Sequence, residues 1–482
     1  MKKTLCILCL LAVLVPAGIA LYRRTMAPRQ FVILSTNDVH SHLDNIPRLA
    51  AAVAACRDTV SCLLVDAGDR WTGDVFVDMA PEPRKPIIDI MNALGYDAAT
   101  LGNHEFDLGR AFLAERIADC RFRLLCGNVS SPHDDFPEIE PYAIFDLDGI
   151  KVGVAGVVTT FDNGHPEGDG PSFEGLEFAP ATDAAAASGR ALEGKCDVKV
   201  LLSHMGYNND SIFAQNNPRL YDLIVSGHTH QLIDTEVGGT VIGQTGRYLP
   251  GVGATTVKMR GHRIAEIDYR IIPLEDYAPD ARYQALVDEI CANPYLNEYV
   301  GYNAEALDKV GLADMFTSLV KRAAGTEIGM YHLGGIRLTG LPADSVKRAT
   351  LINADIFISH VRTMKMTPAQ LRRLIIDKYN DGSSESHRVD IFMTEPYTIV
   401  TDASDRAFDV KFPTLVEGRS YSVASADYIA KNYKGLECED MVHHDELSVT
   451  EIFIDYFENN SPVHFSNVPH NFVVRAENNM SH

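Results

Sequence analysis

Short apolar runs in the first half of the chain alternate with segments in which apolar residues recur at helical spacing. Residues 31–35, 62–65 and 198–202 are apolar runs of strand length. Between them, the segment 49–54, which follows Pro47, and the segment 87–94 have the helical period. Strands and helices that alternate in this way predict an α/β domain.

Five of the apolar runs end abruptly in polar residues of a few types. The loops beyond the carboxyl ends of strands gather the functional groups of open α/β sheets, so we expect these residues to meet at one edge. They are Asp38 and His40 after 31–35, Asp69 after 62–65, Asn103 after 98–101, His204 after 198–202, and His228 and His230 after 223–225.

These seven side chains are candidate metal ligands. Carboxylate and imidazole together suit divalent transition metals such as Mn, Zn, Fe or Co, and the absence of Cys from the set argues against a structural zinc site. Seven ligands are too many for one ion but suit two ions that share a carboxylate. Two ions about 3.5–4 Å apart can generate hydroxide near neutral pH and stabilise an in-line displacement. Any one of these histidines could instead be an ordinary core or surface residue, but the five motifs together favour the metal site.

Length, composition and charge limit the partners of the chain. Its 482 residues are enough for two or three domains, and 46% hydrophobic and 22% charged residues are ordinary for a globular protein. A net charge of −22 argues against a nucleic acid polymer as partner, because binding to a phosphate backbone needs clustered Lys and Arg. A small phosphorylated substrate remains compatible, since bound metal ions can outweigh the global charge.

The first 24 residues have the pattern of a targeting segment. Lys2 and Lys3 precede an apolar run over 5–22, which contains the small residues Gly18 and Ala20. The run fits a signal peptide, and its length also fits an uncleaved N-terminal anchor, which would then be the attachment to a membrane. Either interpretation predicts an exported protein, periplasmic or extracellular.

The cysteines do not form the pattern of a disulfide scaffold. Two of the nine lie in the leader, which leaves an odd and scattered set of seven. Cys126 lies in an apolar run and is expected to be a small buried residue. Pairing of Cys56 with Cys62, or of Cys120 with Cys126, is left open.

The second half of the chain predicts a connector and another α/β domain. Residues 280–290 are amphipathic and follow Pro279, so they predict a helix in a connector over 274–309. Helix-like and strand-like segments then follow at 368–376 and 421–424. The expected organisation is a leader at 1–24, a catalytic domain at 29–273, the connector at 274–309, and a second α/β domain at 310–476.

Several motifs resemble those of a known family. Asn37-Asp38-Val39-His40, Gly68-Asp69, Gly102-Asn103-His104-Glu105, His204-Met205-Gly206 and Gly227-His228-Thr229-His230 are similar to the motif series of the two-metal phosphoesterases. With the second half included, residues 31–474 resemble the 5′-nucleotidase family. The resemblance implies a two-metal phosphoesterase α/β sandwich, joined to a second α/β domain that binds the substrate.

The resemblance also assigns roles in the first domain. It implies that one ion is held by Asp38, His40, Asp69 and His230, and the other by Asp69, Asn103, His204 and His228, with Asp69 shared. His104 would then stabilise charge on the phosphoryl oxygens, and Asp107 would orient its imidazole. Ser41 stands where the family usually has glycine.

In the second domain the resemblance implies nucleoside binding. Arg337, in Gly334-Gly335-Ile336-Arg337, is the candidate for contacting the substrate, and Phe392 and Tyr428 match the two aromatic positions that hold the base. The segment 431–435 departs from the family's glycine-rich turn, with Lys434 in place of a carboxylate. The segment 354–360 also departs from the family's Pro-Phe-Gly-Asn block.

The expected function is that of an exported two-metal phosphoesterase. Its expected substrates are nucleoside 5′-monophosphates or related nucleotides, with hydroxide held between the ions attacking phosphorus. Alternatives within the enzyme class are hydrolysis of 2′,3′-cyclic nucleotides, nucleotide sugars or thiosulfonate-type substrates. A nucleotide-binding receptor without turnover is less favoured, because no ligand is missing from the motifs.

Overall fold

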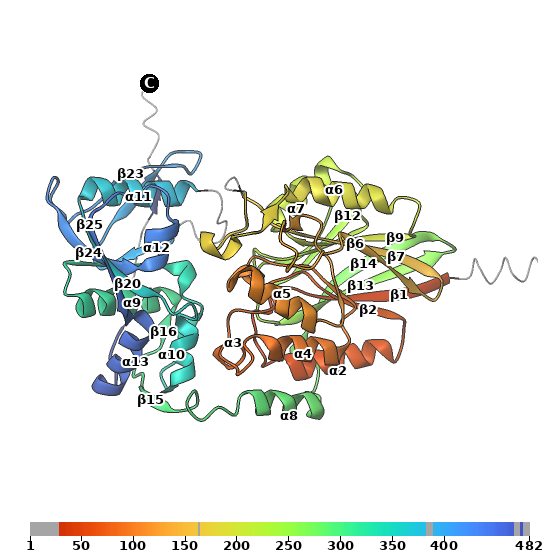
Figure 1. Cartoon of the computed structure of the whole chain (residues 1–482), viewed down its shortest axis with the longest axis horizontal. Coiled ribbons are helices and arrows are strands. Elements are labelled where there is room, and N and C mark those ends of the chain that lie inside the picture. Colours follow the sequence, from red (N-terminus) through yellow and green to blue (C-terminus); the bar gives the residue numbers. More distant parts are fainter. Residues whose placement is uncertain (1–27, 162–163, 382–388, 467–472, 476–482) are drawn as a thin grey trace, which may run out of the picture. The chain divides into compact units, whose positions relative to one another are not determined.

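The structure is a computed structural model that describes residues 28–161, 164–381, 389–466 and 473–475 (Figure 1). The described chain divides into two compact units. The first comprises the described residues up to Trp71, Ile87–Pro166 and Phe173–Val287, and the second comprises Thr72–Pro86, Glu167–Ser172 and the described residues from Asp288 onward. The leader expected at 1–24 lies outside the described residues. The domain boundaries expected from the sequence stay predictions.

The first unit contains two six-stranded sheets. One has the strand order β14-β13-β1-β2-β3-β4, in which β1 to β4 are parallel and β13 and β14 are antiparallel additions at one edge. Its strands are β1 (Pro28–Thr36), β2 (Cys62–Asp66), β3 (Ala98–Ala99), β4 (Arg123–Leu124), β13 (Gly251–Arg260) and β14 (Arg263–Pro273).

The other sheet of this unit has the order β11-β12-β10-β9-β7-β6. Its four central strands are parallel, and β11 and β6 pair antiparallel at its two edges. The strands are β6 (Tyr142–Leu147), β7 (Ile150–Val158), β9 (Val198–His204), β10 (Leu223–Ser226), β11 (Leu232–Val237) and β12 (Thr240–Thr245). A separate short pair joins β5 (Val129–Ser130) and β8 (Glu177–Phe178).

The main core of the first unit draws residues from both sheets. Alternate residues of a strand point to opposite faces, and Ile33 and Val65 of one sheet share a buried cluster with Val200 and Leu202 of the other. Leu201, on the opposite face of β9, joins a second cluster. Both faces of the parallel strands are therefore buried, which explains their continuous apolar runs.

Helices cover the outer faces of this unit. α6 (Ala181–Leu192) and α7 (Tyr207–Asn216) pack their apolar residues onto the second sheet, and α2, α4 and α5 lie on the other side of the unit (Figure 1). The helices predicted around 49–54, 87–94 and 280–290 are confirmed. The bounds are α2 (Ile46–Arg57), α4 (Lys85–Leu94), α5 (Gly109–Asp119) and α8 (Ala281–Ile290), with short 3₁₀ segments η1 (His104–Phe106), η2 (Gly170–Phe173) and η3 (Leu274–Asp276).

The second unit is built on a five-stranded mixed sheet with the order β21-β17-β24-β20-β25, in which only β17 and β24 are parallel. These strands are β17 (Ile328–His332), β20 (His360–Met366), β21 (Ile391–Met393), β24 (Tyr421–Ala426) and β25 (Glu439–Ser448). Smaller sheets join β15 (Tyr299–Tyr302) to β19 (Ser345–Lys347), β16 (Leu307–Asp308) to β18 (Gly340–Leu341), and β22 (Thr398–Thr401) to β23 (Ala407–Lys411) and β26 (Val473–Arg475).

Apolar clusters bury both faces of the five-stranded sheet. On one face, Tyr331 and Ala424 pack with apolar residues of α9 and α13, and on the other face, Met330 and Val423 pack with those of α11. The expected helix at 368–376 is confirmed. The helices are α3 (Val75–Asp78), α9 (Lys309–Ala324), α10 (Arg348–Ala354), α11 (Pro368–Asn380), α12 (Asp427–Asn432) and α13 (Val449–Asn460), with the 3₁₀ segment η4 (Leu333–Gly335).

Two further points follow from the described residues. Among their helices, none combines the length and the apolar character needed to cross a lipid bilayer. Cys126 is buried as expected, and neither Cys56 with Cys62 nor Cys120 with Cys126 forms a disulfide in this structure.

Candidate functional site

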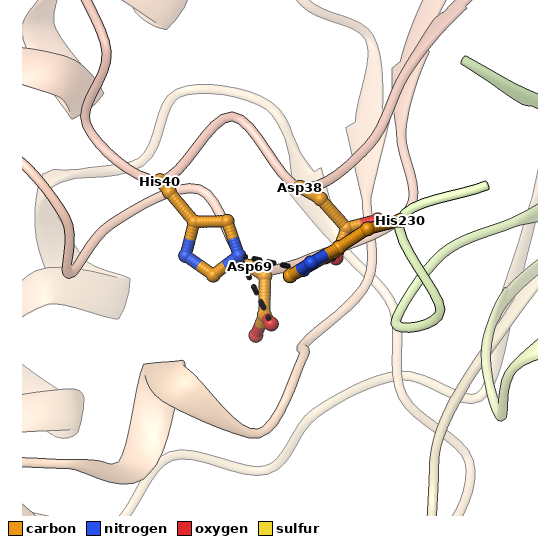
Figure 2. Close-up of side chains that lie close together, drawn as sticks. All are labelled: Asp38, His40, Asp69 and His230. Carbon is orange, nitrogen blue, oxygen red and sulfur yellow. Dashed lines mark hydrogen bonds and ion pairs between the residues drawn. The ribbon is translucent and has the colours of Figure 1, made fainter. Parts of the chain in front are cut away.

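The loops after β1, β2, β9 and β10 bring most of the predicted ligand residues together. Asp38, His40, Asp69 and His230 offer ligand atoms that all lie within 4.8 Å of one another, as do Asp69, His204 and His228. Figure 2 shows the side chains of the first group directed toward one another. Asp69 is the residue that both groups contain.

Individual distances confirm that the first group is compact. His40 Nε2 lies 3.1 Å from His230 Nε2 and 3.7 Å from Asp69 Oδ2. His230 Nε2 lies 3.4 Å from Asp38 Oδ1. Two imidazole nitrogens at 3.1 Å cannot both carry a proton without repulsion, and a shared metal ion would remove that repulsion.

The second group lies on the other side of Asp69. His204 Nε2 is 3.2 Å from Asp69 Oδ2, the same oxygen that faces His40. Asn103 Oδ1 lies 3.0 Å from His228 Nδ1, which brings the seventh predicted ligand to this group. All seven residues predicted from the strand ends therefore meet at one place.

The hydrogen bond of His204 fixes which of its nitrogens can bind a metal. Its Nδ1 lies 2.8 Å from the backbone carbonyl oxygen of Ala67, which can only accept a proton, so Nδ1 is the protonated nitrogen of the neutral ring. The lone pair of Nε2 then points toward Asp69. A partner that holds the outer nitrogen in this way is usual for metal-binding histidines.

Charge around His204 also favours a cation at this place. Burial opposes protonation of His204, but the carboxylates of Asp69 and Asp38 outweigh burial and raise its pKa to about 10. Burial and the charge of His204 lower the pKa of neighbouring His228 to about 3. Two buried carboxylates thus attract positive charge that this crowded set of imidazoles accommodates poorly as protons, which fits divalent ions.

The backbone of the ligand loops adopts a conformation that few residues adopt. Positive φ angles occur at 38 (50°), 40 (48°), 69 (54°), 228 (76°) and 230 (58°), all predicted ligand positions. Such angles cluster at functional sites because they aim side chains in directions that regular structure cannot. Ser41 has a φ of 61°. That angle accounts for the glycine that the family usually has there.

Glu105 is a residue whose role the sequence analysis missed. Its carboxylate is fully buried and accepts backbone N–H groups of Asp69 at 2.9 Å, Arg70 at 3.0 Å and Gly102 at 2.5 Å. It therefore ties the loop after β2 to the loop after β3. Its place beside Asn103 and His104 in one turn was the available signal, but the three amide partners are visible only in the fold.

His104 and Asp107 lie together at the edge of this cluster. His104 Nδ1 is 3.0 Å from Asp107 Oδ2, and both side chains are about 15% exposed. The backbone N–H of His104 donates to Asp69 Oδ1 at 2.9 Å, and the ring centroids of His104 and His40 are 5.1 Å apart. The predicted pair is thus formed next to the ligand groups, while its catalytic role stays a prediction.

In the second unit the structure does not leave Phe392 available to a base. Phe392 lies in β21, opposite Tyr331 in the neighbouring strand, and is 2% exposed within the apolar core. This burial argues against the expected role, because a base stacks only on a ring face that is open to it. The apolar character of 391–393 was the signal for a core position.

Tyr428 stacks on a protein ring. The ring of His332 lies parallel to it, with 4.7 Å between centroids and 13° between planes. Tyr433 presents its edge to both rings and donates its hydroxyl to Asp390. One face of Tyr428 is therefore covered from within the unit. Tyr433 occupies the turn in which the family has glycines.

The remaining candidates of this unit lie elsewhere. The guanidinium of Arg337 lies 5.8 Å from the ring centroid of Phe357, and its backbone N–H donates to the carbonyl of Ala354. Lys434 is exposed. Their roles in substrate binding stay predictions.

Two family models match the chain. Residues 31–232 match the model described as calcineurin-like phosphoesterase, and residues 297–440 match the model of the 5′-nucleotidase C-terminal domain. The order of the two domains is that of the 5′-nucleotidases. The chain belongs to the 5′-nucleotidase family.

Individual relatives agree with this family. The trifunctional nucleotide phosphoesterase YfkN of Bacillus subtilis (strain 168) is 27% identical over 403 residues, which cover 71% of this chain and 27% of YfkN. The chain spans about half, or less, of the length of the curated relatives it matches first.

Solved structures share the fold over nearly the whole chain. A 5′-nucleotidase precursor from Thermus thermophilus has a TM-score of 0.80 at 20% identity, covering 92% of this chain and 99% of that one. The sulfate thiohydrolase SoxB of the same organism has a TM-score of 0.75 at 18% identity, covering 92% and 96%. At these identities the likeness shows the fold, which this member shares with enzymes of different named activities.

Proposed function

We propose that this member of the 5′-nucleotidase family is a metal-dependent phosphoesterase that hydrolyses nucleoside 5′-monophosphates or related nucleotides to nucleoside and phosphate. The observation that carries the proposal is the convergence of seven carboxylate, amide and imidazole ligands on the two sides of Asp69. This donor set suits two divalent ions of the Mn, Zn, Fe or Co class.

The residues divide the work between them. Asp38, His40 and His230 would hold one ion, Asn103, His204 and His228 the other, and Asp69 both. The ions would supply a nucleophilic water at neutral pH and neutralise charge on the phosphoryl oxygens. Asp107 fixes the imidazole of His104 through Nδ1, which leaves Nε2 to donate a hydrogen bond to a phosphoryl oxygen as negative charge develops on it.

A second candidate has support in the second unit. Stacking of His332 on Tyr428, together with the burial of Phe392, favours a leaving group that needs no aromatic sandwich. Such substrates include 2′,3′-cyclic nucleotides, nucleotide sugars and thiosulfonate-type compounds, the last class in line with the named activity of the SoxB neighbour.

A phosphate-release panel tests the first proposal against the second. The metal-loaded protein would be assayed on AMP, UMP, UDP-glucose and 2′,3′-cyclic AMP, and sulfate release would be measured from a thiosulfonate. We expect release from AMP and UMP that a chelator abolishes and added metal restores. Asp58→Asn, which removes an exposed carboxylate of the same unit, is the matched control for loss of charge. Turnover of the thiosulfonate alone would contradict the nucleotidase proposal.

Export is proposed on the leader alone. The apolar run at 5–22 fits a signal peptide or an N-terminal anchor. Fractionation of cells that produce the full chain, with N-terminal sequencing of the recovered protein, distinguishes a cleaved leader from a retained one.

A further inference from the structure

Arg247 places a cation at the edge of the ligand cluster. It follows β12, and its Nη1 lies 3.5 Å from Nδ1 of His230. Its guanidinium carbon lies 4.7 Å from the ring centroid of Tyr248. Among the residues that the structure describes, no carboxylate forms an ion pair with Arg247. An arginine so close to a metal centre and without a carboxylate partner is available to an anionic ligand.

The tautomer of His230 shows what kind of ligand fits beside Arg247. Nε2 of His230 is the nitrogen that faces the other ligand atoms, His40 Nε2 and Asp38 Oδ1. When Nε2 gives its lone pair to a metal, the ring proton is on Nδ1. Nδ1–H and the guanidinium N–H groups are then all donors, so they cannot bond to one another. An oxygen acceptor placed beside both would satisfy both.

Tyr248 holds the guanidinium in this position. The ring of Tyr248 stacks on His42, with 3.9 Å between centroids and 29° between planes, and its backbone N–H donates to the carbonyl of Asp38 at 2.9 Å. Tyr248 and Leu249 both have positive φ, at 65° and 58°. The same loop geometry therefore fixes a ligand residue, Asp38, and the ring on which Arg247 rests, so the cation is positioned before a substrate arrives.

We propose that Arg247 binds a second anionic group of the substrate, adjacent to the phosphoryl group at the ligand cluster. The guanidinium lies on the far side of the His230 ring from the ligand atoms, so an anion that it binds lies beside those atoms and not among them. The inference rests on the proposed phosphoesterase function. It names the substrate class as one with two neighbouring anionic groups, such as a diphosphate.

The test uses two probes without a base or a cleavable ester. Methylenediphosphonate offers two neighbouring anionic groups, and methylphosphonate offers one. Binding of each to the metal-loaded protein is measured by calorimetry for the wild type and for Arg247→Gln. We expect Arg247→Gln to weaken the diphosphonate about tenfold, on the scale of one charged hydrogen bond, and the monophosphonate by less than about twofold. Arg270→Gln, which removes an exposed arginine of the same unit, should change neither.

Two controls keep the result decisive. Metal content by elemental analysis must match the wild type. If Arg247→Gln loses metal, Arg247→Lys serves instead, with an expected weakening of about threefold for the diphosphonate alone, because lysine keeps the charge without the planar fork. Equal weakening of both probes, or of neither, would overturn the inference. Selective weakening in a protein that releases no phosphate from any ester would leave the inference standing and overturn the proposed function.

Discussion

The metal centre of the first unit and the aromatic cluster of the second differ in how the protein uses its functional groups. In the first, the imidazoles and carboxylates point at one another across distances of 3.1–3.7 Å that a divalent ion would bridge. In the second, His332, Tyr428 and Tyr433 satisfy one another through ring stacking and a hydrogen bond to Asp390. One region is arranged for a ligand, and the other largely for itself.

This difference separates chemistry from specificity. The reaction needs residue types at strand ends, and those are present in full. Recognition of a leaving group needs open surfaces of a particular shape, and His332 and the core cover a part of those expected. The family's chemistry is therefore retained more completely in this chain than the family's means of holding a base.

The largest expected effect concerns the residue that both ligand groups contain. Asp69→Asn should lower phosphoesterase activity by about 10³-fold or more, the scale of losing an essential group, and should reduce the metal content of both sites. His40→Ala should reduce mainly one. Elemental analysis of the purified variants, with Asp58→Asn as control, checks this. Two ions per chain retained in Asp69→Asn would remove Asp69 from its shared role.

A smaller effect is expected where binding and chemistry separate within the first unit. His104→Ala should keep both metals and lower kcat by about 10²–10³-fold, as removal of a single oxyanion donor does. Asp107→Asn should act in the same direction but more weakly, because it only loosens the ring. Steady-state kinetics together with metal analysis measure both. Loss of metal from His104→Ala would mean that His104 is a ligand.

The smallest effect, and the sharpest test of the comparison, is expected in the aromatic cluster. His332→Ala uncovers one face of Tyr428, so a base could stack there for about 1–3 kcal/mol at most. KM for AMP should then fall several-fold, while KM for a small aryl phosphate stays within about twofold. Tyr421→Phe, in the neighbouring strand, is a control for general loosening of the unit. Equal changes on both substrates would show that His332 supports the fold alone.

The ligand set could be predicted because each of its residues follows a recognisable strand. Val198 and Leu202 belong to the apolar run of β9, and His204 stands at the end of that strand, so residue type and position sufficed. The helix at 368–376 could be predicted for a similar reason, since Pro368 begins α11 after a Thr367 cap. In both cases the information is local.

The roles of Glu105, Arg247 and His332 could not be predicted from such patterns. Glu105 accepts amides of Asp69 and Arg70, which lie 36 and 35 residues away in the sequence. His332 and Tyr428 meet because β17 and β24 pair in parallel, and no periodicity shows which rings that pairing brings together. Phe392 matched a family position, yet its place in β21 directs it into the core. These features depend on register and packing between distant segments.

The left-handed backbone at Asp38, His40, Asp69, His228 and His230 has a consequence for the history of such a chain. Each of these conformations opposes folding, while glycine adopts it without steric cost. A mutation that exchanges one ligand for glycine would therefore relieve strain and remove a buried polar group in the same step. Descendants freed from selection for catalysis should drift toward more stable proteins with glycine in these loops, and the intact set in this chain is the mark of continued use.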